Sequence, residues 1–323
     1  MNGNTRLNWL APLALALSLG LAGCGQIATP AMKPLSPEAK ALLAQKGMRE
    51  DSPIFIRIFK EESELEVWKV KDDGRYHHFK TYPICNWSGA LGPKIQQGDK
   101  QAPEGFYQVA AKQMNPNSAF HLSFNLGYPN AYDKSHKRTG AHLMVHGDCK
   151  SAGCYAMTDA LIEEIYALAR EAFEGGQEAF DVHAFPFRMT PDNMKRHARN
   201  EWMGFWKQMK QGYDHFEYAR QAPKIEVCQK QYLVNVAFIE RGQVDPAGTC
   251  PAFERLPVEA APPETIIQAG GETAPRPAGL GAIAPASSSG TAQASTAPNT
   301  FGYAPAKPTF SGFAFRSNSK LGQ

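Results

Sequence analysis

The side chains with the most chemistry in this 323-residue chain lie in one short stretch, which has His-Gly at 146–147 and Gly-Cys at 153–154. A thiol acts as a nucleophile when its pKa is lowered, when a base lies beside it and when N–H groups can bind the developing oxyanion. We therefore interpret Cys154 as a nucleophile and His146 as its base. Gly153 lets the backbone approach a substrate closely, so the amides near Cys154 are expected to form an oxyanion hole.

Two other interpretations apply to the same stretch. A lone cysteine and histidine are more often a packed thiol and a satisfied core side chain than catalytic groups. Two histidines and two cysteines close together also suggest zinc, but their spacing does not match common structural zinc sites. We therefore expect neither a metal nor another cofactor. The four residues concerned are His142, His146, Cys149 and Cys154.

A strand and a helix are expected to position these groups. Residues 141–146 alternate as in a strand, which places His142 and His146 on one face together with Met144. Apolar residues at helical spacing follow Thr158-Asp159 and stop at Gly175-Gly176. The N-terminus of that helix would favour a thiolate if its axis points at the sulfur.

Alternation and turn residues predict the remaining elements. Helices are expected to start at Ser36-Pro37 and at Thr190-Pro191, the first stopping at Gly47 and the second reaching Met209. A hairpin is expected around the Asp-Asp-Gly turn at 72–74. Strands are predicted at 54–59, 65–69, 75–82, 106–111 and 180–184, with an edge strand at 232–239.

The N-terminus has the pattern of a targeting segment. An apolar run at 10–21 is too short to span a bilayer comfortably and ends in Leu21-Ala22-Gly23-Cys24. This resembles the lipobox of bacterial lipoproteins, which implies that Cys24 is lipidated and becomes the mature N-terminus; the alternative is an ordinary signal peptide with a chance cysteine. Gly25 in place of Asp favours the outer membrane, so we expect a lipid-anchored protein in the periplasm.

Five cysteines remain beyond Cys24 in a compartment that permits disulfides. An odd number leaves at least one thiol unpaired, and catalysis explains such a thiol. If Cys154 is the free one, three pairings of the others exist, of which we favour Cys228–Cys250. Cys149 is expected to be either a redox partner of Cys154 or a packed thiol. The fifth cysteine is Cys85.

Composition divides the chain and excludes one class of partner. The formal net charge of +3, without a Lys/Arg cluster among aromatics, gives no case for nucleic-acid binding. Ala, Pro, Gly, Ser and Thr dominate the C-terminus, which predicts a disordered tail. The expected segments are a lipoprotein signal peptide at 1–23, a lipidated linker with a short helix at 24–51, a catalytic domain at 52–220, an extension at 221–255 and the tail at 256–323.

The His-Gly and Ser-x-Gly-Cys halves of the central stretch resemble the signature of the L,D-transpeptidase catalytic domain, also called the YkuD domain. The Gly-Cys-Tyr-Ala-Met ending at 153–157 is most similar to a branch with a short loop between the two halves. The resemblance extends over about residues 52–215. It implies a mostly β, α+β fold, with a sandwich or barrel-like sheet and flanking helices. Further similar segments are 88–94, 98–99, 103–107 and 124–130, together with Asp133.

The resemblance assigns roles by position. Cys154 matches the family nucleophile and His146 the catalytic histidine, whose ring the Gly147 carbonyl can orient. Ser151 and Gly153 match the residues that support the nucleophile. Many family members have His where this chain has Ala152, and Arg or Asn where it has Ala156, so a commonly used substrate-binding arginine is missing. Lys94 and Arg188 are candidate replacements, and His142, Tyr128 and Asn130 are further candidates for the substrate cleft.

The resemblance implies acyl transfer on peptidoglycan stem peptides, at meso-diaminopimelate, through a thioester. If water takes the acyl group, the enzyme is instead an amidase that detaches cross-links or a peptidoglycan-attached lipoprotein. Two alternatives are a cell-wall-binding lipoprotein without activity and a zinc-bound structural module. The motif alone does not decide between transfer and hydrolysis.

Overall fold

The computed structural model describes residues 29–240, 242, 244–262, 265–267 and 273–275, in two units, Met1–Pro262 and Pro263–Gln323. The described part of the second unit is one antiparallel hairpin, β15 (Thr265–Ile267) with β16 (Thr273–Pro275). The expected signal peptide, Cys24 and most of the expected tail lie outside the described residues. Among the described helices, none has the length and apolarity needed to cross a membrane.

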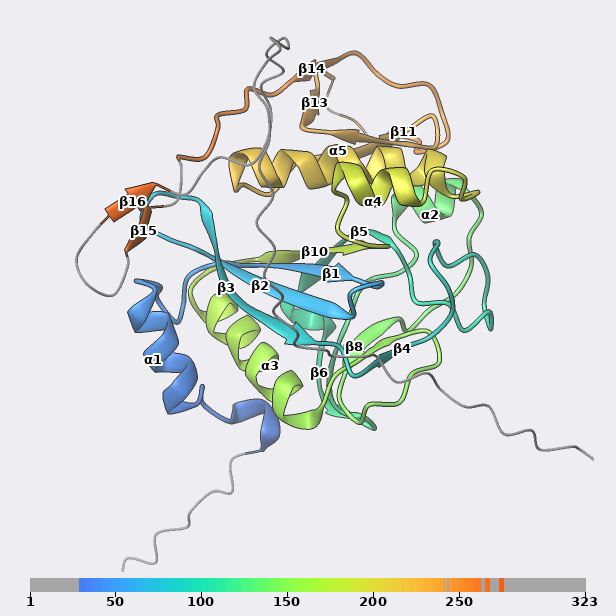
Figure 1. Ribbon diagram of the computed structural model, residues 1–323. Coiled ribbons are helices and arrows are strands. Elements are labelled where there is room, and N and C mark those ends of the chain that lie inside the picture. Colours follow the sequence, from blue (N-terminus) through green and yellow to red (C-terminus); the bar gives the residue numbers. More distant parts are fainter. Residues whose placement is uncertain (1–28, 241, 243, 263–264, 268–272, 276–323) are drawn as a thin grey trace, which may run out of the picture. The chain divides into compact units, whose positions relative to one another are not determined.

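The first unit contains a five-stranded sheet of long strands, here called sheet A, in the order β3-β2-β1-β10-β5. β2 and β3 form the expected hairpin, β1 pairs antiparallel with β2, and β10 pairs with β1 in parallel. Figure 1 shows this sheet running through the middle of the unit with α5 across one side. Its strands are β1 (Ile54–Phe59), β2 (Glu64–Val70), β3 (Tyr76–Pro83), β5 (Gly105–Ala110) and β10 (Ala179–Phe185).

Alternation along β1 explains why both faces of sheet A are covered. Ile54, Ile56 and Ile58 belong to the main core, whereas Phe55 and Phe59 pack with aromatic residues of α5 (Met203–Ala219) on the opposite face. All six residues of β1 are buried. Burying both faces of a central strand anchors the sheet on which the rest of the unit is built.

A second sheet, sheet B, completes the main core. Its order is β4-β9-β8-β7-β6, and its buried residues Phe124, Val145 and Tyr155 share one cluster with sheet A and with α3 (Asp159–Glu174). The fold is therefore α+β with two sheets and flanking helices, as expected. The strands are β4 (Asn86–Trp87), β6 (Met114–Ser118), β7 (His121–Asn125), β8 (Met144–His146) and β9 (Tyr155–Ala156).

Shorter elements surround the two sheets. Ser36 caps α1 and Thr158 caps α3, and both helices stop near the expected glycines. The region after α5 forms two small hairpins, β11 with β12 and β13 with β14. The elements are η1 (Pro30–Met32), α1 (Pro37–Gln45), η2 (Ala111–Gln113), α2 (Ala131–Ser135), α4 (Pro191–Arg196), β11 (Ile225–Cys228), β12 (Gln231–Val234), β13 (Val236–Phe238) and β14 (Phe253–Arg255).

Three expected elements are shorter or interrupted. The strand expected from residue 141 starts at Met144, because His142 has a left-handed backbone (φ 58°) that breaks the alternation. The helix expected from Thr190 to Met209 is two helices, because the Asn200 side chain accepts the Trp202 N–H (2.9 Å) and competes with helical bonding. The strand expected at 232–239 breaks at Asn235, which is also left-handed.

Candidate active site

The two halves of the central motif lie on neighbouring parallel strands of sheet B. β8 ends at His146 and β9 begins one residue after Cys154, with His146 in register with Ala156. The Met144 N–H points at Cys154 Sγ (3.4 Å), and Sγ lies 3.6 Å from the His142 carbonyl oxygen. Strand pairing therefore brings together the expected nucleophile and base from opposite ends of the motif.

Cys154 is the free cysteine among the described residues, as the odd number of cysteines beyond Cys24 predicts. Ser151 supports its turn: Ser151 Oγ accepts the Cys154 N–H (3.1 Å) and donates to the Cys154 carbonyl (2.6 Å). The Cys154 N–H, one of those expected to form an oxyanion hole, therefore already donates a hydrogen bond to Ser151. Gly153 has a φ of 117°, a conformation that favours glycine. A Cβ at this position would lie 3.6 Å from the Gln101 carbonyl oxygen.

Burial raises the pKa of the Cys154 thiol, and the Met144 N–H and the Lys94 charge oppose this only in part. Burial likewise lowers the pKa of His146, against a hydrogen bond with Gly147 and the charge of Asp148. Both shifts favour the uncharged forms. The resting pair at neutral pH is therefore a neutral thiol and a neutral imidazole, in which His146 is free to accept a proton.

The His146 ring contacts the Gly147 carbonyl and the ring of Phe120. Its side chain is 3% exposed, its Nδ1 lies 2.6 Å from the Gly147 carbonyl oxygen, and the Phe120 ring centroid lies 4.8 Å from its own. A carbonyl accepts only, so Nδ1 carries the proton and Nε2 keeps its lone pair. Among the described residues no hydrogen bond joins His146 to Cys154, a common state of catalytic groups before substrate binds.

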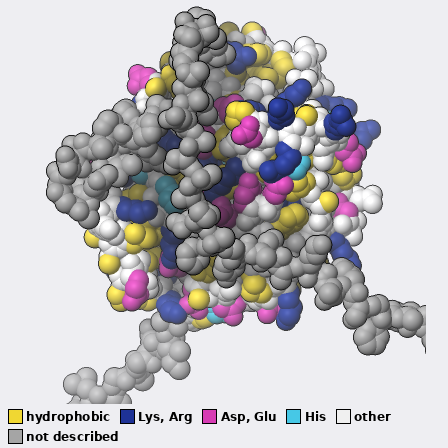
Figure 2. All heavy atoms as spheres, viewed as in Figure 1, with side chains coloured by type: hydrophobic (Ala, Val, Ile, Leu, Met, Phe, Trp, Pro, Cys, Tyr) yellow, Lys and Arg dark blue, Asp and Glu magenta, His cyan; other side chains and the backbone are white. Residues whose placement is uncertain are grey.

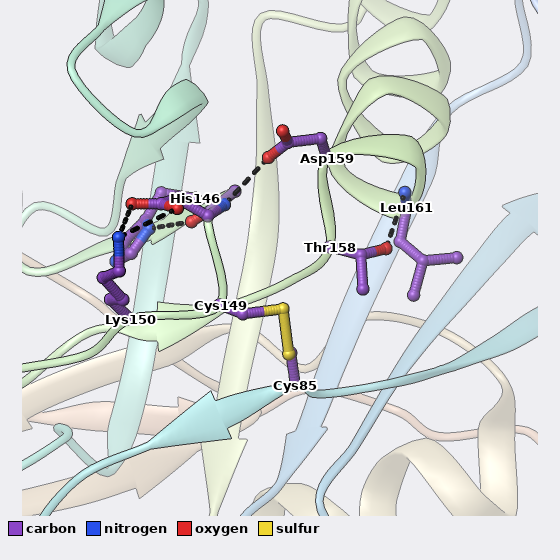
Figure 3. The surroundings of a disulfide bond; sticks show 9 residues. Cys85, His146, Cys149, Lys150, Thr158, Asp159 and Leu161 are labelled. Carbon is purple, nitrogen blue, oxygen red and sulfur yellow. Dashed lines mark hydrogen bonds and ion pairs between the residues drawn. A yellow bond between two sulfur atoms is a disulfide. The ribbon is translucent and has the colours of Figure 1, made fainter.

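A disulfide braces the loop between the two halves. Cys149 is bonded to Cys85, with a Cα–Cα distance of 5.3 Å, and Figure 3 shows this bond beside the loop that follows His146. Our expectation of a redox partner or packed thiol at Cys149 is therefore wrong, because Cys85 precedes β4, which pairs with β9 and places the two cysteines together. The same bond removes Cys149 as a thiolate ligand for zinc. The favoured pair Cys228–Cys250 is confirmed.

The position of α3 differs from the expectation about its dipole. β9 lies between Cys154 and the first residue of the helix, Asp159, so the helix does not start at Cys154. Asp159 instead accepts the Asp148 N–H (2.8 Å) in the loop after His146. Sequence reasoning treated Asp159 only as part of a helix start and missed this contact.

The substrate-cleft candidates separate into two groups. Lys94 is buried, acts electrostatically on Cys154 and is ion-paired with Asp99, while Tyr128 donates to the Lys94 carbonyl (3.2 Å). Asn130 instead caps α2 and donates to the Phe106 carbonyl (2.9 Å).

Arg188 and His142 also lie differently from the expectation. Arg188 is ion-paired with Glu64 and Glu66 of β2 and stacks over Phe59, so its charge is committed on sheet A. The His142 side chain is exposed on a left-handed residue, and its backbone carbonyl, not its ring, contacts Cys154. Of the two basic candidates, Lys94 and Arg188, Lys94 is the one whose charge acts on Cys154.

Comparison with known proteins gives one family. The model of the L,D-transpeptidase catalytic domain matches residues 54–176. A protein named "Putative L,D-transpeptidase YafK" from Escherichia coli K12 is 42% identical over 228 residues, which cover 69% of this chain and 90% of that protein. Its counterpart in Escherichia coli O157:H7 gives the same values.

Solved structures also match, and two of them illustrate the similarity. The helical cell shape determining protein Pgp2 of Campylobacter jejuni is 17% identical, with a TM-score of 0.33, over 58% of this chain and 79% of Pgp2. Bd1075 of Bdellovibrio bacteriovorus is 19% identical, with a TM-score of 0.30, over 52% of this chain and 63% of Bd1075. From the family model and the YafK relatives, the chain belongs to the L,D-transpeptidase catalytic domain (YkuD) family.

Proposed function

We propose that the protein is a cysteine-dependent peptidoglycan L,D-transpeptidase with Cys154 as nucleophile and His146 as base. The observation that carries the proposal is the free Cys154 thiol, left out of two disulfides and placed at the β8–β9 pair that also holds His146. Family membership supports the reaction class.

In the proposed reaction, His146 Nε2 takes the proton from Cys154 Sγ as the sulfur attacks the carbonyl of an L-to-D amide at meso-diaminopimelate. The S–C bond forms, the C–N bond breaks, and His146 returns the proton to the leaving amine. An acceptor amine of a second stem peptide then displaces Sγ from the thioester, and its proton passes to the thiolate through His146. The Met144 N–H supports the thiolate, because a donor 3.4 Å from the sulfur favours the charged form.

Hydrolysis is the second candidate, and two features of the motif favour it. Ala152 and Ala156 stand where many relatives carry His and Arg or Asn, and Ala156 lies in register with His146. The motif therefore lacks the arginine to which the family resemblance gives a role in binding a substrate carboxylate, and its loop is short; both features favour hydrolysis as an alternative. With water as acceptor, the same thioester chemistry releases a cross-link or a lipoprotein attached to peptidoglycan.

Mass spectrometry of muropeptides after incubation with the purified protein tests both candidates. New diaminopimelate cross-links indicate transpeptidation, and loss of a cross-link or bound protein without a new bond indicates hydrolysis. Cys154→Ala is expected to abolish turnover and His146→Ala to reduce it by at least about 10³-fold, with folding unchanged. Turnover by the Cys154 variant would contradict Cys154 as the nucleophile in both candidates. Absence of turnover in the wild type would instead leave the non-catalytic cell-wall-binding protein.

We also propose that Cys24 carries a lipid that anchors the protein in the periplasm, on the outer membrane. The lipobox at 21–24 and the short apolar run before it support this proposal. Cys24→Ser is expected to move the protein from the membrane fraction to the soluble fraction. Continued sedimentation of the variant with membranes would contradict the anchor, and Cys154→Ser, which replaces a free thiol, controls for the loss of a cysteine as such.

A further inference from the structure

One peptide unit beside His146 is hydrogen-bonded at both of its ends. Its carbonyl, from Gly147, lies 2.6 Å from His146 Nδ1, and its N–H, from Asp148, donates to Asp159 Oδ1 at 2.8 Å. Figure 3 shows Asp159 reaching from the start of α3 to this loop. Because a peptide unit is planar, fixing its N–H end also fixes the direction of its carbonyl.

Glycine at position 147 makes this arrangement sterically allowed. A Cβ at this position would lie 2.6 Å from Asp159 Oδ1 and 3.0 Å from the Phe120 carbonyl oxygen. The first distance is shorter than ordinary carbon–oxygen contacts, and the second is at their limit. The family's His-Gly pair in this chain therefore leaves room for a carboxylate to approach the peptide.

The loop beyond this peptide is held in an unfavourable backbone conformation. Asp148 and Cys149 are consecutive residues with φ of 66° and 49°, a region that costs non-glycine residues about 1 kcal/mol each. The Cys85–Cys149 disulfide and the Cys149 N–H, which donates to the Met157 carbonyl (3.2 Å), hold the far end of the turn. The near end is held by the bond to Asp159.

We propose that Asp159 is a positioning residue for His146 that acts through the Gly147–Asp148 peptide. The proposal rests on the proposed function, in which His146 Nε2 moves the proton. Asp159 fixes the peptide, the Gly147 carbonyl then holds the Nδ1–H, and Nε2 keeps its lone pair for Cys154. The carboxylate also polarises the peptide and strengthens its carbonyl as an acceptor.

Orientation, not charge, carries most of this effect. Asp159 is exposed, so water screens its charge, whereas the geometry of its bond to the Asp148 N–H is unaffected by screening. An asparagine at 159 retains an oxygen that accepts this N–H. Asn is therefore expected to preserve the function and Ala to lose it, which separates geometry from charge.

Asp159 also lies in the first turn of α3, where a carboxylate stabilises the helix dipole. Two variants control for that role. Thr158→Ala removes the N-cap, whose side chain accepts the Leu161 N–H, without touching the peptide. Asp192→Ala removes an exposed first-turn carboxylate from α4, which is also capped by a threonine.

Other charged or titratable groups on the elements packed against His146 stay in place in these variants. They are Asp148 and Lys150 on the following loop, the Cys154 thiol before β9, Glu163 on α3 and His121 at the start of β7.

The test is ¹⁵N NMR of the histidine side chains in the full chain, with the His146 signal assigned by its loss in His146→Gln. The wild type is expected to show the Nδ1–H tautomer. In Asp159→Ala the tautomers should mix, and the pKa of His146 should fall further, because the Gly147 hydrogen bond that raises it is weakened. Asp159→Asn should keep the wild-type spectrum.

Turnover provides the second readout. Asp159→Ala is expected to lower kcat about 10-fold with KM little changed, and Asp159→Asn to stay within about 2-fold. An unchanged tautomer and pKa in Asp159→Ala, or the same shift in Thr158→Ala, would overturn the proposal. Absence of turnover in the wild type would instead contradict the proposed function, while the NMR result still decides the role of Asp159.

Discussion

The two sheets of the first unit hold their strands together in different ways. Strands of sheet A are six to eight residues long, and its central strand, β1, is buried on both faces. Strands of sheet B are two to five residues long. Ladders this short supply few backbone hydrogen bonds, so sheet B depends on a disulfide and on side chains that bond the backbone. The candidate active site is built on the sheet with the weaker ladder.

Sheet A is further joined to the loop before β5 by a buried ion pair. The side chains of Lys60 and Glu104 are fully buried, with Nζ 3.0 Å from Oε1, and Nζ also donates to three backbone carbonyls. Glu104 Oε2 accepts the indole N–H of Trp206 in α5 (2.8 Å). This pair connects the end of β1 with α5 and with the loop before β5, which lies against Gly153.

The largest effect on stability is therefore expected at this pair. Glu104→Ala leaves the Lys60 charge buried without its partner and should lower the free energy of unfolding by about 3–5 kcal/mol. Denaturant unfolding measures the loss. The exposed pair Lys210–Asp214 is the control, because Asp214→Ala should change stability by no more than about 0.5 kcal/mol. Equal losses in the two variants would contradict the role of burial.

A smaller loss of stability, but a larger loss of activity, is expected on sheet B. Replacing Cys85 and Cys149 together by alanine should lower the free energy of unfolding by about 2–4 kcal/mol. Turnover should fall as well, because the disulfide holds the loop between His146 and Cys154. Replacing Cys228 and Cys250 is the matched control: it removes a disulfide from the C-terminal extension and should leave kcat unchanged.

The smallest expected effect is on pH dependence. Burial lowers the pKa of His146, so the acid limb of kcat/KM should lie below the ordinary histidine value of about 6.5. Phe120→Ala exposes the ring to water and should move this limb upward by about half a unit, because desolvation then disfavours the imidazolium less. Phe253→Ala, which removes a half-exposed ring on β14, should leave the profile in place. A downward shift in the Phe120 variant would contradict the assignment.

Prediction from sequence succeeded where a local pattern decides the structure. Alternation at 54–59 predicted β1 because a period of two is a property of the strand itself. The start of α3 after Thr158 was predicted from the helical spacing that follows it, and Thr158 caps that helix through a neighbouring N–H. The odd cysteine count indicated a free thiol. The expected domain boundaries stay predictions, since the described residues do not test them.

Features that depend on the path of the chain were missed. Cys149 was expected to be a redox partner or a packed thiol, whereas its disulfide with Cys85 follows from β4 meeting β9; the favoured Cys228–Cys250 pair left this pairing open to it. The bond from Asp148 to Asp159 likewise requires two consecutive left-handed residues. Arg188 was a candidate for the cleft because of its segment, but Glu64 and Glu66 across sheet A bind it.

The Cys85–Cys149 disulfide also has a consequence for the order of events in oxidative folding. In the unfolded chain Cys149 is only five residues from Cys154 but 64 from Cys85, so random collisions favour the wrong disulfide. That wrong bond would consume the thiol proposed to do the chemistry. The native bond forms preferentially only after β4 has paired with β9. We therefore expect an oxidant that acts before these strands meet to close the Cys149–Cys154 bond, and one that acts afterwards to leave the Cys154 thiol free.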